Sequence, residues 1–103
     1  MYQVLKGISG RIFDFDLTLT DEEGEPLVLE EGEKYFFAVG NPAGEGIDLT
    51  GESSHFRIER LPLSPGRYRF DAGIEYPDGT RLTVLTAEDS RLVVGKKANE
   101  DGK

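Results

Sequence analysis

The sequence has no cysteine and no tryptophan, and it has few basic residues. Without cysteine the chain can form neither a disulfide framework nor a thiolate metal site. Its 103 residues include 12 Lys and Arg against 20 Asp and Glu, a formal charge of −8. Such an acidic chain is not expected to bind nucleic acid or anionic membranes, because Lys and Arg supply most of the attraction to phosphate groups.

Long apolar runs are also missing. No stretch approaches the roughly 20 apolar residues of a membrane-spanning helix, and residues 1–10 lack the apolar core of a signal peptide. We therefore expect a soluble protein without a signal peptide or a transmembrane segment. Amphipathic helices are not expected either, since no segment of about ten residues places its apolar side chains at helical spacing.

The sequence instead alternates apolar and polar residues in the way that is typical of β-strands. Within residues 11–20 every second side chain from Phe13 to Leu19 is apolar, and residues 67–76 repeat the pattern. Seven or eight short strands separated by turns predict an immunoglobulin-like antiparallel β-sandwich. The other strands are expected at residues 27–29, 34–39, 47–50, 55–59, 80–86 and 91–94.

The length of the chain fits a single domain. We expect an N-terminal segment at residues 1–9, the sandwich at 10–95 and a disordered polar tail at 96–103. The side chains expected in the core are Phe13, Phe15, Leu17, Phe37, Phe56, Ile58, Tyr68, Phe70, Ile74, Leu82 and Val84.

Two turns are predicted to shape the sandwich. An Asp-Gly pair after residues 67–76 is typical of a β-hairpin, because both residues tolerate positive φ. A Pro-Gly turn before Tyr68 resembles the tyrosine corner of Greek-key sandwiches; the alternative is an exposed turn followed by an ordinary strand aromatic. We favour the corner, since Tyr68 shares the inward parity of Phe70 and a buried phenol needs a partner. The residues given a structural role are Leu63, Pro65, Gly66, Tyr68, Asp78 and Gly79.

The sequence gives little support for catalysis. His55 is the only histidine, and the neighbouring Ser53 and Ser54 do not form a triad with it by adjacency, because consecutive residues of a strand point to opposite faces. Asp14 and Asp16 are expected about 7 Å apart on one strand face. A glycosidase can use that spacing, but alternating Asp residues are also the usual way to keep an exposed sheet face in water, and we favour this second interpretation.

Metal and phosphate sites are not indicated either. The acidic turns at residues 21–25 and 30–33 lack the helix-flanked pattern of a calcium loop. The glycine-rich residues 40–46 lack the Lys-Ser/Thr ending and the following helix of a phosphate loop. We therefore expect no catalytic, cofactor or metal-binding residues, and we expect that the protein is not an enzyme.

Four short sequence segments, in this order along the chain, resemble segments of a known protein family. They are DLTLTDEEGEPLVL at 16–29, IDLTG at 47–51, LSPGRYRFD at 63–71 and YPDGTRLTVL at 76–85. Over residues 10–94 the chain resembles the N-terminal immunoglobulin-like domain of phage baseplate upper proteins and similar small domains of phage tail fibres. It departs from the family at residues 9–11, where Ser-Gly-Arg replaces a Gly-Asp-Thr-like step, and in placing IDLTG after residues 34–39.

The resemblance implies a virion structural protein, a tail or baseplate component encoded by a phage or prophage. It implies a location in the virion or in the cytoplasm of a prophage-bearing bacterium, and it brings no catalytic or cofactor residues. A free-standing carbohydrate- or peptide-binding sandwich is the alternative. A sugar platform would need aromatic rings that face water, so exposed aromatics distinguish the two hypotheses.

Association with a protein partner or with further copies of the chain is expected from residues 34–39. Their side chains are apolar on both faces, and one sandwich core covers only one face. The second face must be covered by a loop of the same chain, by another copy or by a partner. The candidate interface residues are Tyr35, Phe36 and Tyr76.

Overall fold

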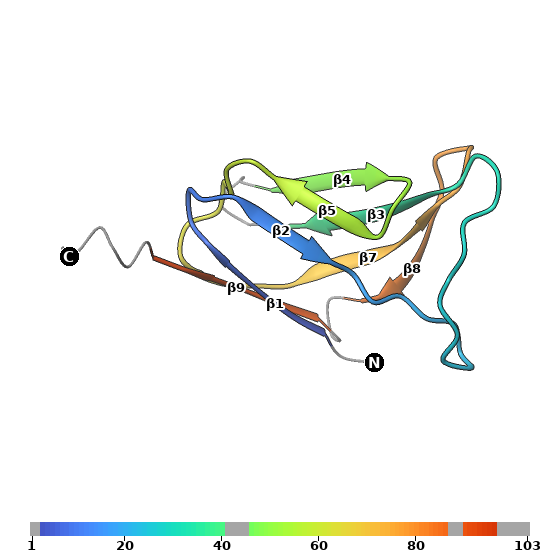
Figure 1. The fold of residues 1–103 in the computed structure, drawn as a ribbon, viewed down its shortest axis with the longest axis horizontal. Helices are drawn as coiled ribbons and strands as arrows, with labels where there is room; N and C mark the ends of the chain where they lie inside the picture. Colours follow the sequence, from blue (N-terminus) through green and yellow to red (C-terminus); the bar gives the residue numbers. More distant parts are fainter. Residues whose placement is uncertain (1–2, 41–45, 87–89, 97–103) are drawn as a thin grey trace.

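The chain folds into β-strands. The computed structural model describes residues 3–40, 46–86 and 90–96, and within these residues it contains no helix. The all-β fold expected from the alternation is confirmed. The strands are β1 (Gln3–Ile8), β2 (Phe13–Asp16), β3 (Lys34–Val39), β4 (Ile47–Gly51), β5 (His55–Ile58), β6 (Gly66–Tyr68), β7 (Phe70–Glu75), β8 (Arg81–Leu85) and β9 (Ser90–Gly95) (Figure 1).

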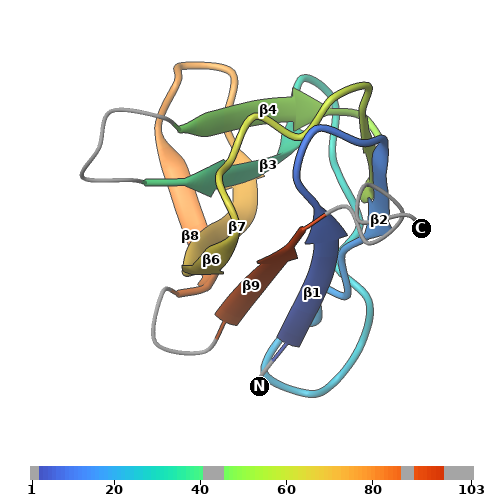
Figure 2. The same ribbon diagram turned by 90° about the vertical axis from the view of Figure 1, so that its left-hand side faces the viewer.

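The strands form three hydrogen-bonded groups around one interior. The largest has the order β4-β3-β7-β8, the second is the pair β2-β5, and the third has the order β1-β9-β6. Figure 2 looks along the molecule and shows β1 and β9 across the interior from β3 and β4. Every strand pair is antiparallel except β1 and β9, which run parallel.

Phenylalanines hold the groups together. The ring centroid of Phe15 on β2 lies 4.7 Å from that of Phe37 on β3 and 5.7 Å from that of Phe56 on β5. Phe70 on β7 lies 5.0 Å from Phe37. Each such pair contributes about 0.5–1.5 kcal/mol beyond the burial of its area. The alternation of β2 therefore places its aromatic side chains where they join β2-β5 to β3 and β7.

The segment from Leu17 to Leu27 closes one end of the sandwich. Leu17 and Leu19 are buried beyond the end of β2, and the Leu27 N–H donates to the Leu19 carbonyl at 3.0 Å. The strand predicted at 27–29 is wrong: in the described residues this region has only an isolated bridge between Thr20 and Pro26. Pro26 has no N–H to continue a ladder, and the Tyr35 hydroxyl donates to the Leu27 carbonyl at 2.7 Å.

The predicted strand at 67–76 is divided into β6 and β7, which belong to different sheets. The Tyr68 hydroxyl donates to the Ser64 carbonyl at 2.7 Å, which is the contact expected of a tyrosine corner. Leu63 is buried and Pro65 is exposed, and Gly66 begins β6. The corner therefore stands where the chain passes from one sheet to the other.

The Asp-Gly turn forms the β7–β8 hairpin. Gly79 has φ of +92°, a conformation that side chains rarely adopt, and its N–H donates to the Tyr76 carbonyl at 2.9 Å. The Asp78 carboxylate accepts hydrogen bonds from the backbone N–H and the hydroxyl of Thr80, at 3.0 and 2.7 Å. These bonds lower the pKa of Asp78.

A β-bulge in β8 changes which of its side chains face the core. Ala72 pairs with Leu85 and Gly73 pairs with Thr83, so Val84 is an extra residue. Leu85 is fully buried, Val84 packs against the core from a half-buried position, and Leu82 is 48% exposed. The prediction that Leu82 points inward is wrong, because simple alternation does not include the bulge. A Cβ atom at Gly73 would lie 1.9 Å from the Leu82 carbonyl oxygen, so the close approach needs glycine.

The N-terminal segment belongs to the sandwich, contrary to the expected boundary at residue 10. β1 pairs with β9 from Gln3–Ser90 to Ile8–Gly95, and Leu5 joins the buried core. β9 is secured to β7 by the Ser90 hydroxyl, which hydrogen-bonds both the N–H and the carbonyl of Phe70. The predicted tail at 96–103 lies outside the described residues, apart from Lys96.

Candidate functional site

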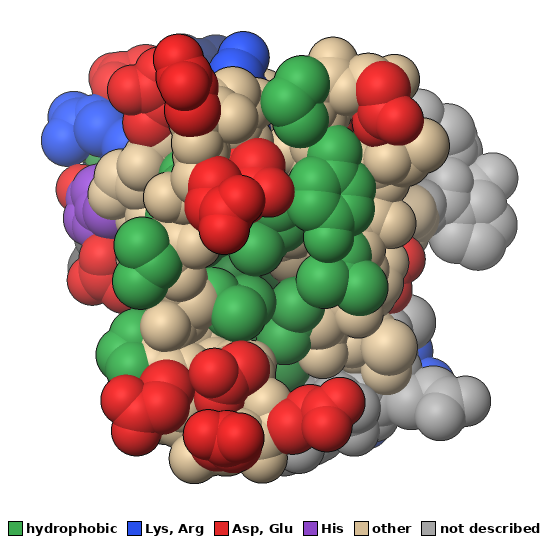
Figure 3. All heavy atoms as spheres, turned by 90° about the vertical axis from the view of Figure 1, so that its right-hand side faces the viewer, with side chains coloured by type: hydrophobic (Ala, Val, Ile, Leu, Met, Phe, Trp, Pro, Cys, Tyr) green, Lys and Arg blue, Asp and Glu red, His purple; other side chains and the backbone are tan. Residues whose placement is uncertain are grey.

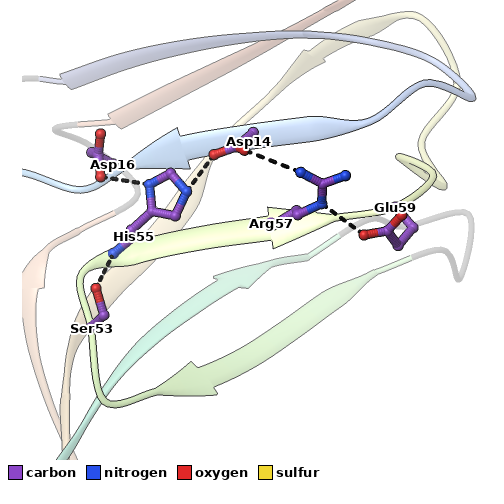
Figure 4. Close-up of polar contacts among 6 residues, drawn as sticks. All are labelled: Asp14, Asp16, Ser53, His55, Arg57 and Glu59. Carbon is purple, nitrogen blue, oxygen red and sulfur yellow. Dashed lines mark hydrogen bonds and ion pairs between the residues drawn. The ribbon is translucent and has the colours of Figure 1, made fainter.

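The outer face of β2-β5 has a charged cluster around the single histidine (Figure 4). The inner face of these strands is occupied by phenylalanines, so Asp14, Asp16, His55 and Arg57 point outward. Asp16 lies opposite His55 in the register, and Asp14 lies opposite Arg57. The shared exposed face expected for Asp14 and Asp16 is confirmed, while the pairing with a strand 39 residues away was not foreseen.

Both ring nitrogens of His55 are engaged by carboxylates. Its Nδ1 lies 2.7 Å from Asp16 Oδ1, and its Nε2 lies 2.5 Å from Asp14 Oδ1. The hydrogen bond to Asp16, together with the charges of both carboxylates, raises the pKa of His55 above 6.5. Arg57 extends the cluster, with its guanidinium 3.6 Å from Asp14 and its Nε 2.7 Å from Glu59.

This cluster is arranged as a cross-strand brace. A general base needs a free nitrogen next to a reacting group, whereas each nitrogen of His55 already faces a carboxylate. The Ser53 hydroxyl accepts a hydrogen bond from the His55 backbone N–H at 3.1 Å. This bond stabilises the turn before β5 and does not involve the imidazole. In the described part of the chain no three His, Asp or Glu side chains are placed to hold a metal ion.

An arginine covers Phe36 on the outer face of β4-β3-β7-β8. The Arg81 guanidinium lies 4.6 Å from the centroid of the Phe36 ring. It also bonds Glu75 Oε1 and Asp48 Oδ1, each at 2.8 Å, and thereby spans the sheet from β8 to β4. Phe36 is left 2% exposed.

The three candidate interface residues therefore present little surface. Phe36 lies beneath Arg81, Tyr35 is half-buried with its hydroxyl bonded to Leu27, and Tyr76 is half-buried at the hairpin. The second apolar face of residues 34–39 is covered within the chain, so it does not require a partner. In the described residues, the exposed large hydrophobic side chains are all aliphatic.

A first hollow, of about 530 Å³, lies at the end of the sandwich that residues 17–27 close. Figure 3 faces this end and shows apolar side chains in a continuous band with acidic side chains on both sides. Val28, close to Leu27 in the chain, is 78% exposed. The hollow is lined by Thr20, Asp21, Glu22, Leu27, Leu82, Thr83 and Val84.

A second hollow, of about 340 Å³, lies on the outer face of β1-β9-β6 and is lined by Val4, Arg67, Arg91 and Val93. It shares no residue with the first hollow. Sequence reasoning missed it because β1 was not foreseen, although the alternation of residues 90–95 already separates Arg91 and Val93 from the buried Leu92 and Val94.

Comparison with known proteins adds no relative, because no family model, no curated protein and no solved structure matches the chain. Within the described residues, no helix has the length and hydrophobicity to cross a membrane.

Proposed function

We propose that this protein is a non-enzymatic structural module that acts through protein–protein contacts, as a tail or baseplate component of a phage or prophage particle. The observation on which the proposal rests is the pair of shallow, charged and apolar hollows on different surfaces of one sandwich. Broad surfaces with an apolar centre and a charged rim are typical of protein interfaces.

The histidine cluster supports a non-enzymatic role. Its imidazole is held between two carboxylates on the open face of β2-β5, where it braces two strands. The first hollow is lined by aliphatic, threonine and acidic side chains and the second by valines and arginines, and neither is lined by the histidine cluster.

The phage assignment is supported by how the resembling sequence steps lie on the fold. IDLTG forms β4, the LSPGRYRFD step forms the corner between β6 and β7, and YPDGTRLTVL forms the β7–β8 hairpin. Three of the four segments thus each correspond to one structural unit, while the segment at 16–29 runs from the end of β2 through an irregular region. The alternative carbohydrate platform has less support, because the phenylalanine and tyrosine rings of the described residues are all buried or half-buried.

Deletion of the gene from the phage or prophage that encodes it tests the proposal. Induced particles should lack normal tails or baseplates by electron microscopy, and mass spectrometry of wild-type particles should detect the protein at a fixed ratio to a tail protein. Complementation in trans controls for effects on neighbouring genes. Normal, infectious particles from the deletion strain, with no copy of the protein in wild-type particles, would overturn it.

A further inference from the structure

The outer face of β1-β9-β6 is positively charged although the chain as a whole is acidic. The register places alternate side chains of the three strands on this face. Asp and Glu are missing from these positions. We call this surface the basic face; its side chains are Val4, Lys6, Ile8, Arg67, Arg91 and Val93.

The cations of the basic face are not neutralised within the described residues. Lys6, Arg67 and Arg91 have no carboxylate partner among residues 3–40, 46–86 and 90–96. The Nε of Arg91 is buried and lacks a hydrogen-bond partner in the same part of the chain. Val4 and Ile8 are each 43% exposed beside these charges. Such a face is suited to an apolar surface that also supplies carboxylates.

The same chain contains a surface with these properties. At the end shown in Figure 3, exposed aliphatic side chains lie between acidic groups. Figure 1 shows that this end, formed by the residues after β2 and by the β7–β8 hairpin, lies at the right-hand side, away from most of β1 and β9. We call it the acidic end; its side chains are Asp21, Glu22, Leu27, Val28, Leu82 and Val84.

We propose that the basic face of one copy docks on the acidic end of a second copy. This inference rests on the proposed assembly function and specifies the surfaces that it uses. Contact of either surface with itself would place like charges together, which disfavours a two-fold dimer through these surfaces. Contact between the two different surfaces pairs Arg and Lys with Asp and Glu around aliphatic side chains.

The arrangement is a head-to-tail contact with a structural consequence. A docked pair leaves the acidic end of one copy and the basic face of the other unoccupied, so further copies can add. Contacts of this kind build rings when the rotation closes and filaments when it does not. The self-association arises from two hollows of about 340 and 530 Å³ and not from the covered Phe36 face.

Charge reversal on each surface separately tests the contact. We expect Arg67→Glu and Glu22→Lys each to weaken self-association by about tenfold or more, because each places like charges across the interface. Arg60→Glu and Glu59→Lys bring the same charge changes beside β5 and should leave association unchanged. Sedimentation velocity over a concentration series measures the association, and circular dichroism checks that each variant folds.

Mixing the two variants gives the sharper result. Each variant keeps the surface that the other has lost, so a mixture of Arg67→Glu and Glu22→Lys chains should associate at concentrations at which neither variant associates alone. A loss in Arg67→Glu only would mean that the basic face binds itself or another acidic surface of the chain, and would overturn the head-to-tail contact. Wild-type chains that remain monomeric at every concentration would overturn it as well, while the presence of the protein in particles would still support the proposed function.

Discussion

Arg81 covers the Phe36 ring on the outer face of the main sheet, with the guanidinium carbon 4.6 Å from the ring centroid. Glu75 and Asp48 hold the guanidinium in place from two other strands. An apolar ring that alternation alone would leave exposed is thereby covered by a cation of the same chain. The arrangement also explains how residues 34–39 can be apolar on both faces.

Removal of the Arg81 side chain should expose this ring. We expect Arg81→Ala to lower the free energy of unfolding by about 1–2 kcal/mol, through the lost cation–π contact and the lost packing of the arginine stem. Arg81→Lys keeps the charge but loses the fork that bonds two carboxylates, so an intermediate loss is expected. Urea unfolding measures both variants, and equal stability of Arg81→Ala and wild type would contradict the covering role.

Gly73 tests the bulge between β7 and β8. Gly73→Ala should destabilise the fold by about 3 kcal/mol or more, because its Cβ would lie 1.9 Å from the Leu82 carbonyl oxygen. Gly40→Ala is a matched control, since a Cβ there meets nothing within 4 Å, and it should change stability by less than about 0.5 kcal/mol. Similar melting curves for the two variants would show that the strands do not approach so closely.

The His55 brace predicts a pH-dependent stability. The pKa of His55 is raised in the folded chain, mainly by its hydrogen bond to Asp16, so its contribution is complete below the unfolded pKa of about 6.5. The contribution is lost as pH rises through the higher folded pKa. Because the chain has a single histidine, the melting temperature of wild type should fall over this window, while that of His55→Gln should not. A proton NMR titration of His55 with a midpoint at or below 6.5 would contradict the brace.

Tyr68 tests the corner. Tyr68→Phe removes the hydroxyl that bonds the Ser64 carbonyl and should cost about 0.5–1.5 kcal/mol, the net value of a typical hydrogen bond. Tyr76→Phe serves as the comparison, since no hydrogen bond of the Tyr76 hydroxyl occurs within the described residues. Chemical denaturation of both variants distinguishes a specific loss from a general effect of the substitution.

Alternation in the sequence predicted the central strands and most of the core, because those residues are buried by a pattern that is local to each strand. Phe13, Phe15, Phe37 and Phe70 are buried as expected. The bulge at Gly73 was not predictable in this way, since it depends on the backbone of β8 approaching β7. Because of this bulge, Leu85 is the buried residue of β8 in place of the expected Leu82.

The two candidate surfaces were less predictable than the core. β1 has apolar side chains on both faces, with Val4 and Ile8 outward and Leu5 inward. Its own sequence pattern therefore does not identify which face is buried. Its role depends on parallel pairing with β9 at the other end of the chain. Similarly, the acidic turns were visible in the sequence, but the exposed Leu82 beside them depends on the bulge in β8, which no sequence motif indicates.

The size of the protein in the cells that encode it tests the central claim of assembly most directly. Sucrose-gradient fractions of a lysate, taken after induction of particles and analysed by mass spectrometry, should place the protein with the tail proteins at high mass. The Arg67→Glu variant should shift toward lighter fractions, and Arg60→Glu should not. Wild-type protein found entirely as a free chain of 11.4 kDa would contradict a structural role in a particle.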